Sequence, residues 1–437
     1  MSLKNCKNIN KLRHDFYWGR AGCRLFPLIV LLAVFSGCAS MPIPRVAPVP
    51  VEQFEPFSQK DAGVITPDSA IHDIPDVDIL ELSDEMKRLV DTSLSGVKDP
   101  SKRLNILAKI LSDRVRYDIE SDIYGIKTAR ETFETGTGNC LSFSNMFVAM
   151  ARYAGLNAQY QEIPTPPNWT RSGEVLFFTL HVGAFVDVYN RLDYTVQLYG
   201  GPADRVVVWS STTRYMFTPS EWGLYNPEAS PLSAQPIPDH RAFAQYYNNF
   251  GSMYLADGNS SQAFRYFVKA ISIDPKLDFA WSNLGVVYSR NGQFKAAEAA
   301  YRQGISASRG PDDVNVMTIL GNMARLYKKS GDQEKSEFFE NEVATFRQRN
   351  PYYHYAIAKT AFYDQLYEES VSHFKAAIKR KNNDHLFYYG LALAYYKLGD
   401  LDKAHKNLNR AKHYAWSEAK KDYYDQVWEK LSSGDGF

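Results

Sequence analysis

The sequence predicts an α+β domain followed by an all-α solenoid. Between residues 76 and 225, apolar residues at helical spacing are followed by short runs rich in Val, Phe, Tyr and Leu, as in antiparallel strands. From about residue 244, small and aromatic residues recur with a period of 34, which is typical of a helical repeat array. The 437 residues are enough for two or three domains of ordinary size.

The composition excludes several classes of protein. Lys and Arg number 50 and Asp and Glu 49, so the chain lacks the basic excess with which proteins bind nucleic acid. No phosphate-binding glycine motif follows a predicted strand. The four cysteines, Cys6, Cys23, Cys38 and Cys140, are too few for a disulfide scaffold and form no CxxC pair for zinc. We therefore expect no nucleic acid, no nucleotide, no metal and no other cofactor.

The first 37 residues have the pattern of a secretory signal peptide. Residues 1–24 carry six basic residues and one acidic residue, and an apolar run follows over 25–35. This run is shorter than the ~20 residues that a membrane-spanning helix needs, so we expect residues 1–37 to be removed. The run leads into Ser36-Gly37-Cys38, which resembles the lipobox of bacterial lipoproteins.

The lipobox resemblance implies that the mature chain begins at Cys38 and that this cysteine is acylated. Ala39, rather than Asp, follows it, which in such lipoproteins implies attachment to the outer membrane, facing the periplasm. The following residues, 38–75, contain repeated prolines that cannot donate backbone hydrogen bonds, so we expect a Pro-rich extended linker there. Cys140 would then be the one remaining thiol that is not acylated.

The 34-residue period is clearest in its first two copies. Gly251 and Phe267 of the first copy correspond to Gly285 and Tyr301 of the second. The pattern resembles the tetratricopeptide repeat, in which small residues let two helices cross closely and an aromatic ring fills the space beside them. This resemblance implies that the array binds a protein or peptide partner.

The repeats also define the boundaries of the C-terminal half. We expect a linker at 226–243, about five tetratricopeptide repeats at 244–414 and a C-terminal capping helix at 415–437.

The domain expected at 76–225 has a cysteine at the start of a helix. Cys140 follows Gly138 and Asn139, and apolar side chains then recur at helical spacing up to Gly155. Unpaired N–H groups and the helix dipole at such a position favour a thiolate over a thiol. The same N–H groups can bind an oxyanion, so Cys140 is a candidate nucleophile.

A nucleophilic cysteine needs a base within hydrogen-bonding reach. His181 lies in a predicted strand and is the only histidine between His72 and His240. The domain therefore offers one thiol and one imidazole as a candidate pair.

These residues lie in two short motifs. Thr-Ala-Arg-Glu-Thr-Phe occupies 128–133, and Gly-Asn-Cys-Leu-Ser-Phe-Ser occupies 138–144, with the strand histidine about 40 residues further on. Together they resemble the transglutaminase-like superfamily of cysteine enzymes. The resemblance implies a papain-like Cys-His-Asp triad, as in hydrolases, transamidases and bacterial periplasmic proteases, with the roles of Cys and His falling on Cys140 and His181.

The third member of the triad departs from the family pattern. The family usually has an Asp about 15 residues after the histidine, on the next strand, and the best-placed residue here is Gln197. An amide oxygen can orient the imidazole, although it does not stabilise an imidazolium as a carboxylate does. Asp193 is the alternative third residue, and Asp187 lies on the histidine strand itself.

Two hypotheses follow. In the first, the chain is an outer-membrane lipoprotein whose cysteine site acts as a hydrolase or acyltransferase on amide bonds, most simply a protease-like enzyme, beside repeats that bind a substrate or partner. In the second, the transglutaminase-like domain is a catalytically inactive platform, and the chain is a protein-interaction adaptor in the cell envelope.

Overall fold

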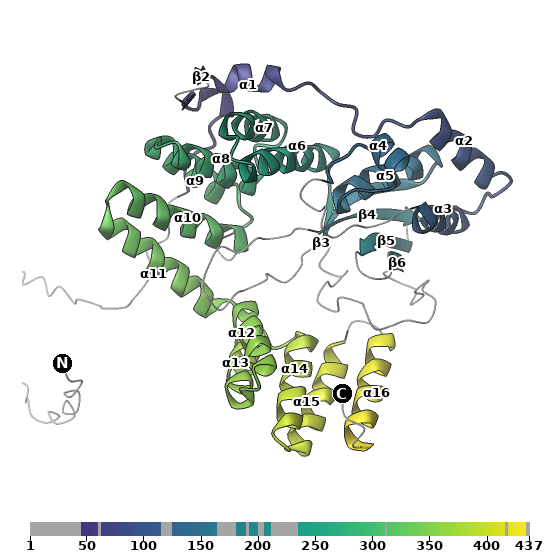
Figure 1. Ribbon diagram of the computed structural model, residues 1–437. Coiled ribbons are helices and arrows are strands. Elements are labelled where there is room, and N and C mark those ends of the chain that lie inside the picture. Colours follow the sequence, from purple (N-terminus) through teal and green to yellow (C-terminus); the bar gives the residue numbers. More distant parts are fainter. Residues whose placement is uncertain are drawn as a thin grey trace, which may run out of the picture. The chain divides into compact units, whose positions relative to one another are not determined.

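The computed structural model describes residues 45–59, 63–114, 125–163, 181–188, 192–199, 205–210, 235–310, 313–415 and 418–433 (Figure 1). For residues 112–114, 163, 181, 192–199, 205–210, 235, 314 and 418–419 it describes the backbone alone. The predicted signal peptide and Cys38 lie outside the described residues. Within the described ranges, no helix is long and apolar enough to cross a membrane.

Five of the described strands form one antiparallel sheet in the order β6-β5-β4-β3-β7. They are β3 (Asn157–Ile163), β4 (His181–Val188), β5 (Leu192–Tyr199), β6 (Arg205–Ser210) and β7 (Gln235–Ile237). From β3 to β6, strands that follow one another in sequence are also neighbours in the sheet, as in a meander. The predicted class, an α+β domain before an all-α solenoid, is confirmed.

Helix α5 (Cys140–Tyr153) lies in the interior of this domain. It packs against β3 and β4 and against three other helices, α2 (Asp84–Ser93), α3 (Pro100–Arg114) and α4 (Ala129–Thr135). Residues 141–151 are buried all round, which explains why small and apolar side chains occupy every face of the helix. Alternate residues of β4, Val182, Ala184 and Val186, are buried with it.

The described part of the expected linker at 226–243 is folded. β7 extends the sheet beyond β3, with Tyr160 opposite Ile237. Helix α6 (Asp239–Ala256) begins two residues later, after Pro238 at its N-cap. The sheet therefore continues directly into the repeats, because β7 forms its edge strand.

In the described residues after 238, ten helices form five antiparallel pairs and one further helix follows. The pairs are α6 with α7 (Ser260–Ile273), α8 (Asp278–Arg290) with α9 (Phe294–Ala307), α10 (Val314–Ser330) with α11 (Gln333–Arg349), α12 (Pro351–Tyr363) with α13 (Tyr367–Arg380), and α14 (His385–Lys397) with α15 (Leu401–Tyr414). Helix α16 (Glu418–Ser433) packs on α15. Within a pair the helices cross closely, since a Cβ on Gly285 would overlap the ring of Tyr301.

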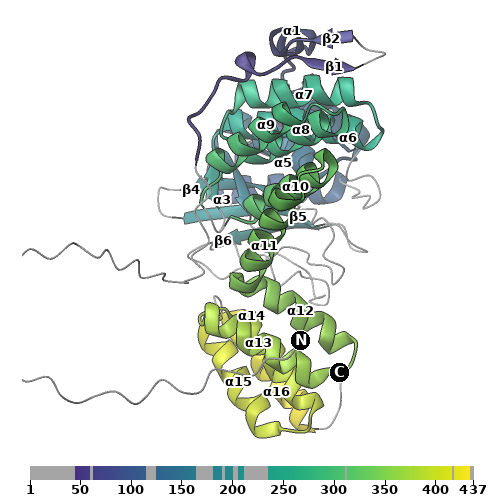
Figure 2. The same cartoon turned by 90° about the vertical axis from the view of Figure 1, so that its left-hand side faces the viewer.

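Residues 45–77 form an N-terminal strap on the repeats rather than the free spacer that the prolines predict. The strap contains η1 (Val51–Gln53), β1 (Phe57–Gln59), β2 (Gly63–Ile65) and α1 (Pro67–Asp73). Figure 2 shows α1, β1 and β2 against α7. Phe57 is fully buried and stacks on Phe264 of α7 at 5.1 Å between ring centroids. The regular elements of the strap are short, and apolar residues such as Phe57 are buried by the repeats.

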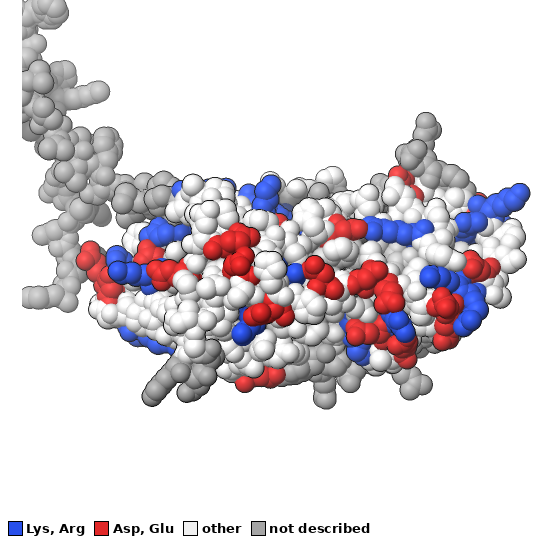
Figure 3. All heavy atoms as spheres, turned by 90° about the horizontal axis from the view of Figure 1, so that it is seen from above, with Lys and Arg blue, Asp and Glu red and all other residues white. Residues whose placement is uncertain are grey.

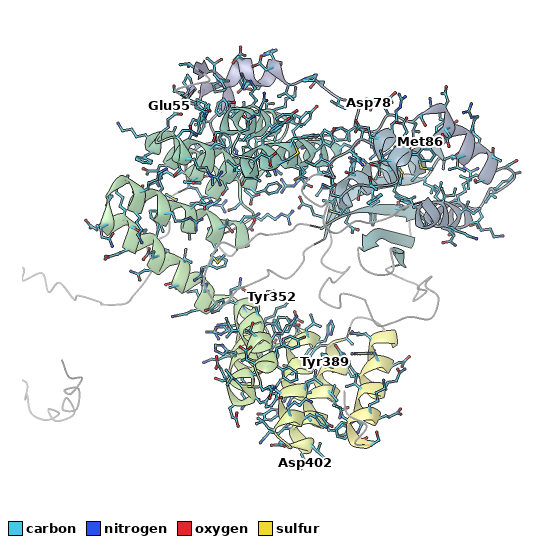
Figure 4. The ribbon with its side chains drawn as sticks, viewed as in Figure 1. Glu55, Asp78, Met86, Tyr352, Tyr389 and Asp402 are labelled. Atoms are coloured by element: carbon cyan, nitrogen blue, oxygen red, sulfur yellow. The ribbon has the colours of Figure 1, made fainter. Side chains whose placement is uncertain are left out.

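Side chains of the repeats also satisfy the extended backbone of the strap. Val46 N donates to Ser306 Oγ at 2.8 Å, and Gln303 Nε2 donates to the Ala47 carbonyl at 2.9 Å. Further along, the hydroxyl of Tyr288 donates to the Glu55 carbonyl. Glu55 is labelled where the strap crosses the helices in Figure 4. Buried backbone groups need such partners, so the strap is part of the folded unit.

Phe57→Ala should lower the free energy of unfolding by about 3–5 kcal/mol, because it leaves a cavity beneath the strap. Urea unfolding followed by circular dichroism measures this change. Val64→Ala is the matched control in the same strap, since Val64 is 68% exposed and its loss should cost under ~0.5 kcal/mol. Equal, small effects of the two changes would contradict a packed strap.

Candidate active site

Cys140 is the first residue of α5 and is half-buried. Asn139 is the N-cap, and its side-chain oxygen accepts from Ser142 N at 2.9 Å. This bond satisfies one of the N–H groups that a helix leaves open at its start. The predicted placement of a cysteine at a helix N-terminus is therefore present in the structure.

The loop before Cys140 is held by the hydroxyl of Ser142. Ser142 Oγ donates to the Gly125 carbonyl at 2.7 Å and accepts from Lys127 N at 2.9 Å. Asn139 N also donates to the Gly125 carbonyl, at 2.9 Å. A Cβ on Gly138 would lie 2.7 Å from Ser142 Cβ, so this position has room only for glycine. The helix start and the loop at 125–139 are thus fixed to each other.

Ser144 connects the cysteine helix to the histidine strand. Its buried hydroxyl lies 2.8 Å from the Cys140 carbonyl and 3.0 Å from the Val182 carbonyl. Val182 directly follows His181 in β4. The backbone beside His181 therefore lies next to the first turn of α5, so the structure brings the segments of the two candidate catalytic residues together.

The register of the sheet distinguishes the two candidates for the third residue. Asp193 lies opposite Asp187, six residues along β4 from His181, which is about 20 Å at the usual rise per strand residue. Gln197 follows Val196, whose partner is Ala184, three residues from His181. The register therefore favours Gln197 over Asp193. The side chains of His181, Asp193 and Gln197 lie outside the described residues, so the triad stays a prediction.

A buried hydrogen bond between side chains connects α5 to β3 inside the domain. Asn145 Nδ2 donates to the Lys127 carbonyl at 3.1 Å, and the Tyr160 hydroxyl donates to Asn145 Oδ1 at 2.8 Å. Burial raises the pKa of Tyr160 and keeps its hydroxyl protonated. Sequence reasoning missed this pair, although an Asn inside an otherwise apolar helix was a local signal for a buried polar contact.

Glu162 on β3 carries a buried charge near the site, with 1% of its side chain exposed. Arg241 Nε and Gln245 Nε2, both from α6, donate to Oε1 at 2.8 and 2.7 Å. Arg309, which follows α9, donates to Oε2. Sequence reasoning missed this cluster, because the three donors lie 79 to 147 residues after Glu162 in the sequence and no local pattern links them to it.

Charged groups outside this cluster are distributed over the surface of the described residues. In the part of the chain that the structure describes, no group of three or more His, Cys, Asp or Glu residues could hold a metal ion. On the face drawn in Figure 3, Lys and Arg are interspersed with Asp and Glu. This mixture is typical of an ordinary solvated surface.

Comparison with protein families identifies both parts of the chain. Residues 87–196 match the transglutaminase-like superfamily, and residues 244–277, 278–349 and 355–418 match the tetratricopeptide repeat. The chain contains a transglutaminase-like domain followed by tetratricopeptide repeats. The resemblances to the transglutaminase-like superfamily and to the tetratricopeptide repeat are confirmed, whereas the lipobox resemblance stays a prediction. Since such repeats typically mediate protein or peptide binding, the array supports a protein-binding role.

Individual relatives match this two-part chain only in part. Over 120 residues it is 28% identical to superkiller protein 3 of Schizosaccharomyces pombe, which covers 28% of this chain and 8% of the relative. Over 176 residues it is 24% identical to Hsp70-Hsp90 organizing protein 3 of Arabidopsis thaliana, which covers 38% of this chain and 29% of the relative. The chain therefore spans less than a third of either relative.

Solved structures of repeat proteins are also similar. YrrB, a TPR protein with an unusual peptide-binding site, is 15% identical with a TM-score of 0.21, over 42% of this chain and 92% of its own. PilF of Pseudomonas aeruginosa is 18% identical with a TM-score of 0.23, over 45% of this chain and 95% of its own.

Asp278, the first residue of α8, is a buried carboxyl group beside the Glu162 cluster. Burial, together with the charge of Asp313, raises its pKa from 3.8 to about 6, against the opposing effects of Asn315 and Arg241. Asn315 Nδ2 donates to Asp278 Oδ2 at 2.9 Å. The carboxyl group thus titrates in a pH range where most carboxyl groups are already ionised.

We expect Asp278 to make the stability of the repeats depend on pH. The folded state binds its proton more tightly than the unfolded chain, so this stabilisation is complete below pH 3.8 and is lost as the pH rises through 6, about 3 kcal/mol in all. Asp278→Asn cannot titrate, so from pH 4 to 7 it should gain about this much stability relative to the wild type. Urea unfolding of both chains measures the difference, and a difference that stays constant with pH would contradict the prediction.

Proposed function

We propose that this chain is an outer-membrane lipoprotein, facing the periplasm, whose transglutaminase-like domain acts on amide bonds through Cys140 and His181. The observation that carries the proposal is the contact of Ser144, one turn after Cys140, with the carbonyl of Val182, the residue after His181. A thiol at a helix start beside an imidazole is the arrangement that activates a cysteine nucleophile. Gln197 would orient the imidazole.

In the proposed reaction, the imidazole of His181 accepts the thiol proton and the sulfur of Cys140 attacks the carbonyl carbon of the amide. Backbone N–H groups at the start of α5 stabilise the oxyanion. The C–N bond then breaks, and the amine leaves with the proton from the imidazolium, so that a thioester remains. Attack by water on the thioester gives an acid, and attack by an amine gives a new amide. We propose hydrolysis, because bacterial periplasmic members of the superfamily include proteases.

The repeats and the N-terminus would place this site at the membrane. We propose that the array binds the protein or peptide that supplies the substrate, and that acylated Cys38 is the anchor. Because the strap packs on the repeats from residue 45 onward, only residues 38–44 would link that anchor to the folded part. Seven residues reach at most about 25 Å, so the array would lie close to the membrane surface.

An electrophilic amide mimic should form a covalent adduct with Cys140, identified by mass spectrometry of the peptide that carries it. His181→Ala should lower labelling at pH 7 about tenfold, because the thiol pKa would return toward its ordinary value near 8.5. If the pH dependence of labelling is centred near 8.5 and is the same in the variant, the thiol is not activated. That outcome would favour the adaptor hypothesis, in which the domain is an inactive platform.

Gln197→Asp should raise the rate of Cys140 alkylation at pH 7 by several-fold, about 1 kcal/mol, because a carboxylate stabilises the imidazolium that accompanies the thiolate. The rate is measured with iodoacetamide on the full chain. Asp193→Asn is the control and should leave the rate unchanged, since the register holds Asp193 far along the strand from His181. A loss of rate in Asp193→Asn alone would instead make Asp193 the third residue.

A further inference from the structure

We propose that Glu162 is a positioning residue for His181 and that the first two repeats act through it as part of the active site. This inference rests on the proposed function. It assigns to the repeats a structural role in the chemistry, in addition to the binding of a partner.

The first step is the register between β3 and β4. Glu162 lies opposite Val182, and the next pair is Ile163 with His181. Neighbouring strands are held about 4.8 Å apart by their backbone hydrogen bonds. Whatever fixes the end of β3 therefore also fixes the backbone of His181.

The second step is what holds the end of β3. The carboxylate of Glu162 is buried, and a buried negative charge needs hydrogen-bond donors, charged ones above all. Those partners come from the repeats: Arg241 and Gln245 from the first and Arg309 from the end of the second. Arg241 is itself held by Asp274, whose Oδ2 lies 3.0 Å from Nη1. β3, the neighbour of the histidine strand, is thus anchored to two repeats.

The third step is the connection to the nucleophile. The carbonyl of Val182, opposite Glu162, accepts a hydrogen bond from Ser144, one turn after Cys140 in α5. A contiguous set of hydrogen bonds and strand pairs therefore runs from Arg241 through Glu162 and Val182 to α5.

Glu162 is not in a position to replace the missing triad carboxylate. Oε1 accepts from both Arg241 and Gln245, and Oε2 accepts from Arg309. Since both oxygens face donors from the repeats, Glu162 acts on His181 through the strand and not by direct contact with the reacting atoms.

The chain provides a matched control for the loss of such a contact. Arg152, in the last turn of α5, forms a bidentate ion pair with Asp239 of α6 at 2.6 and 2.8 Å. Arg152 Nε also donates to the Ala158 carbonyl at 2.8 Å, and Ala158 pairs with Val186. This pair also joins the domain to the first repeat, but at the far end of β3 and β4 from His181.

The experiment measures the pH dependence of Cys140 alkylation by iodoacetamide on the full chain, at the peptide that carries Cys140. Glu162→Gln removes the charge and keeps the shape of the side chain. We expect the midpoint of the pH profile to rise by about one unit, equivalent to about tenfold less thiolate at pH 7. Asp239→Asn should leave the midpoint unchanged, and His181→Ala, the reference, should raise it at least as far as Glu162→Gln. Circular dichroism and thermal unfolding report folding of each variant.

The outcomes separate this inference from the proposed function. An unchanged midpoint in His181→Ala removes the proposed function, and this inference with it. A shift in His181→Ala but none in folded Glu162→Gln overturns this inference alone. Equal shifts in Glu162→Gln and Asp239→Asn also overturn it, because they would indicate general loosening. If Glu162→Gln does not fold, Gln245→Ala removes one of the three donors, and a folded Gln245→Ala with the wild-type midpoint overturns the inference.

Discussion

A buried carboxylate is stable only where several donors converge on it, and Glu162 is such a group. Its donors belong to α6 and to the residues after α9, so the strand that carries it is held by the repeats. β7 and the start of α6 continue from that sheet without a free linker. The strap adds a further connection, since the Tyr247 hydroxyl of α6 lies 3.1 Å from Val77 N. The transglutaminase-like domain, the strap and the first two repeats therefore share their stabilising contacts.

Because these contacts are shared, a deletion of the repeats would also affect the transglutaminase-like domain. Removal of the repeats would leave Glu162 without Arg241, Gln245 and Arg309, and would expose Phe57 and the other apolar residues of the strap. Breaking a buried ion pair from one side costs more than the pair itself contributes, because an unpaired charge stays behind. A loss of function after such a deletion would thus reflect both partner binding and the integrity of the transglutaminase-like domain. Single substitutions such as those at Glu162 and Asp239 separate the two.

The features that could be predicted from the sequence are those with local signals. Cys140 was predicted at a helix start from Asn139 and the helical spacing that follows, and the repeats were predicted from their period. A close helix crossing at Gly285 could be predicted because a glycine and an aromatic ring recur at the same spacing in the first two repeats. In each case the residues that determine the structure lie within one or two elements of each other.

The features that could not be predicted depend on distant partners. The prolines near the N-terminus predict an extended linker, and they carry no signal for the β1–β2 pair and α1 that form there. Nor do they indicate that Phe57 is buried, which depends on Phe264, more than 200 residues away. Similarly, a Glu in a strand is ordinary in sequence, and it becomes an anchor only when Arg241 and Arg309 are brought to it by the packing of the repeats. Local composition limits the secondary structure that a segment can form. Which distant residues bury that segment depends on the tertiary fold.

An amide at position 197 would make the site unusually dependent on this tertiary fold. A carboxylate there would stabilise the imidazolium electrostatically, whereas an amide only orients the ring. The thiolate must then be stabilised mainly by the start of α5, and that stabilisation falls off within the first turn of the helix. The interaction therefore requires the imidazole and the helix start to stay in register. The hydroxyl of Ser144 holds the helix start to the backbone of β4 beside His181, and the repeats hold the neighbouring strand β3 through Glu162. With an amide as the third residue, precise positioning of the His181 backbone by the repeats would compensate for part of the stabilisation that a triad carboxylate provides.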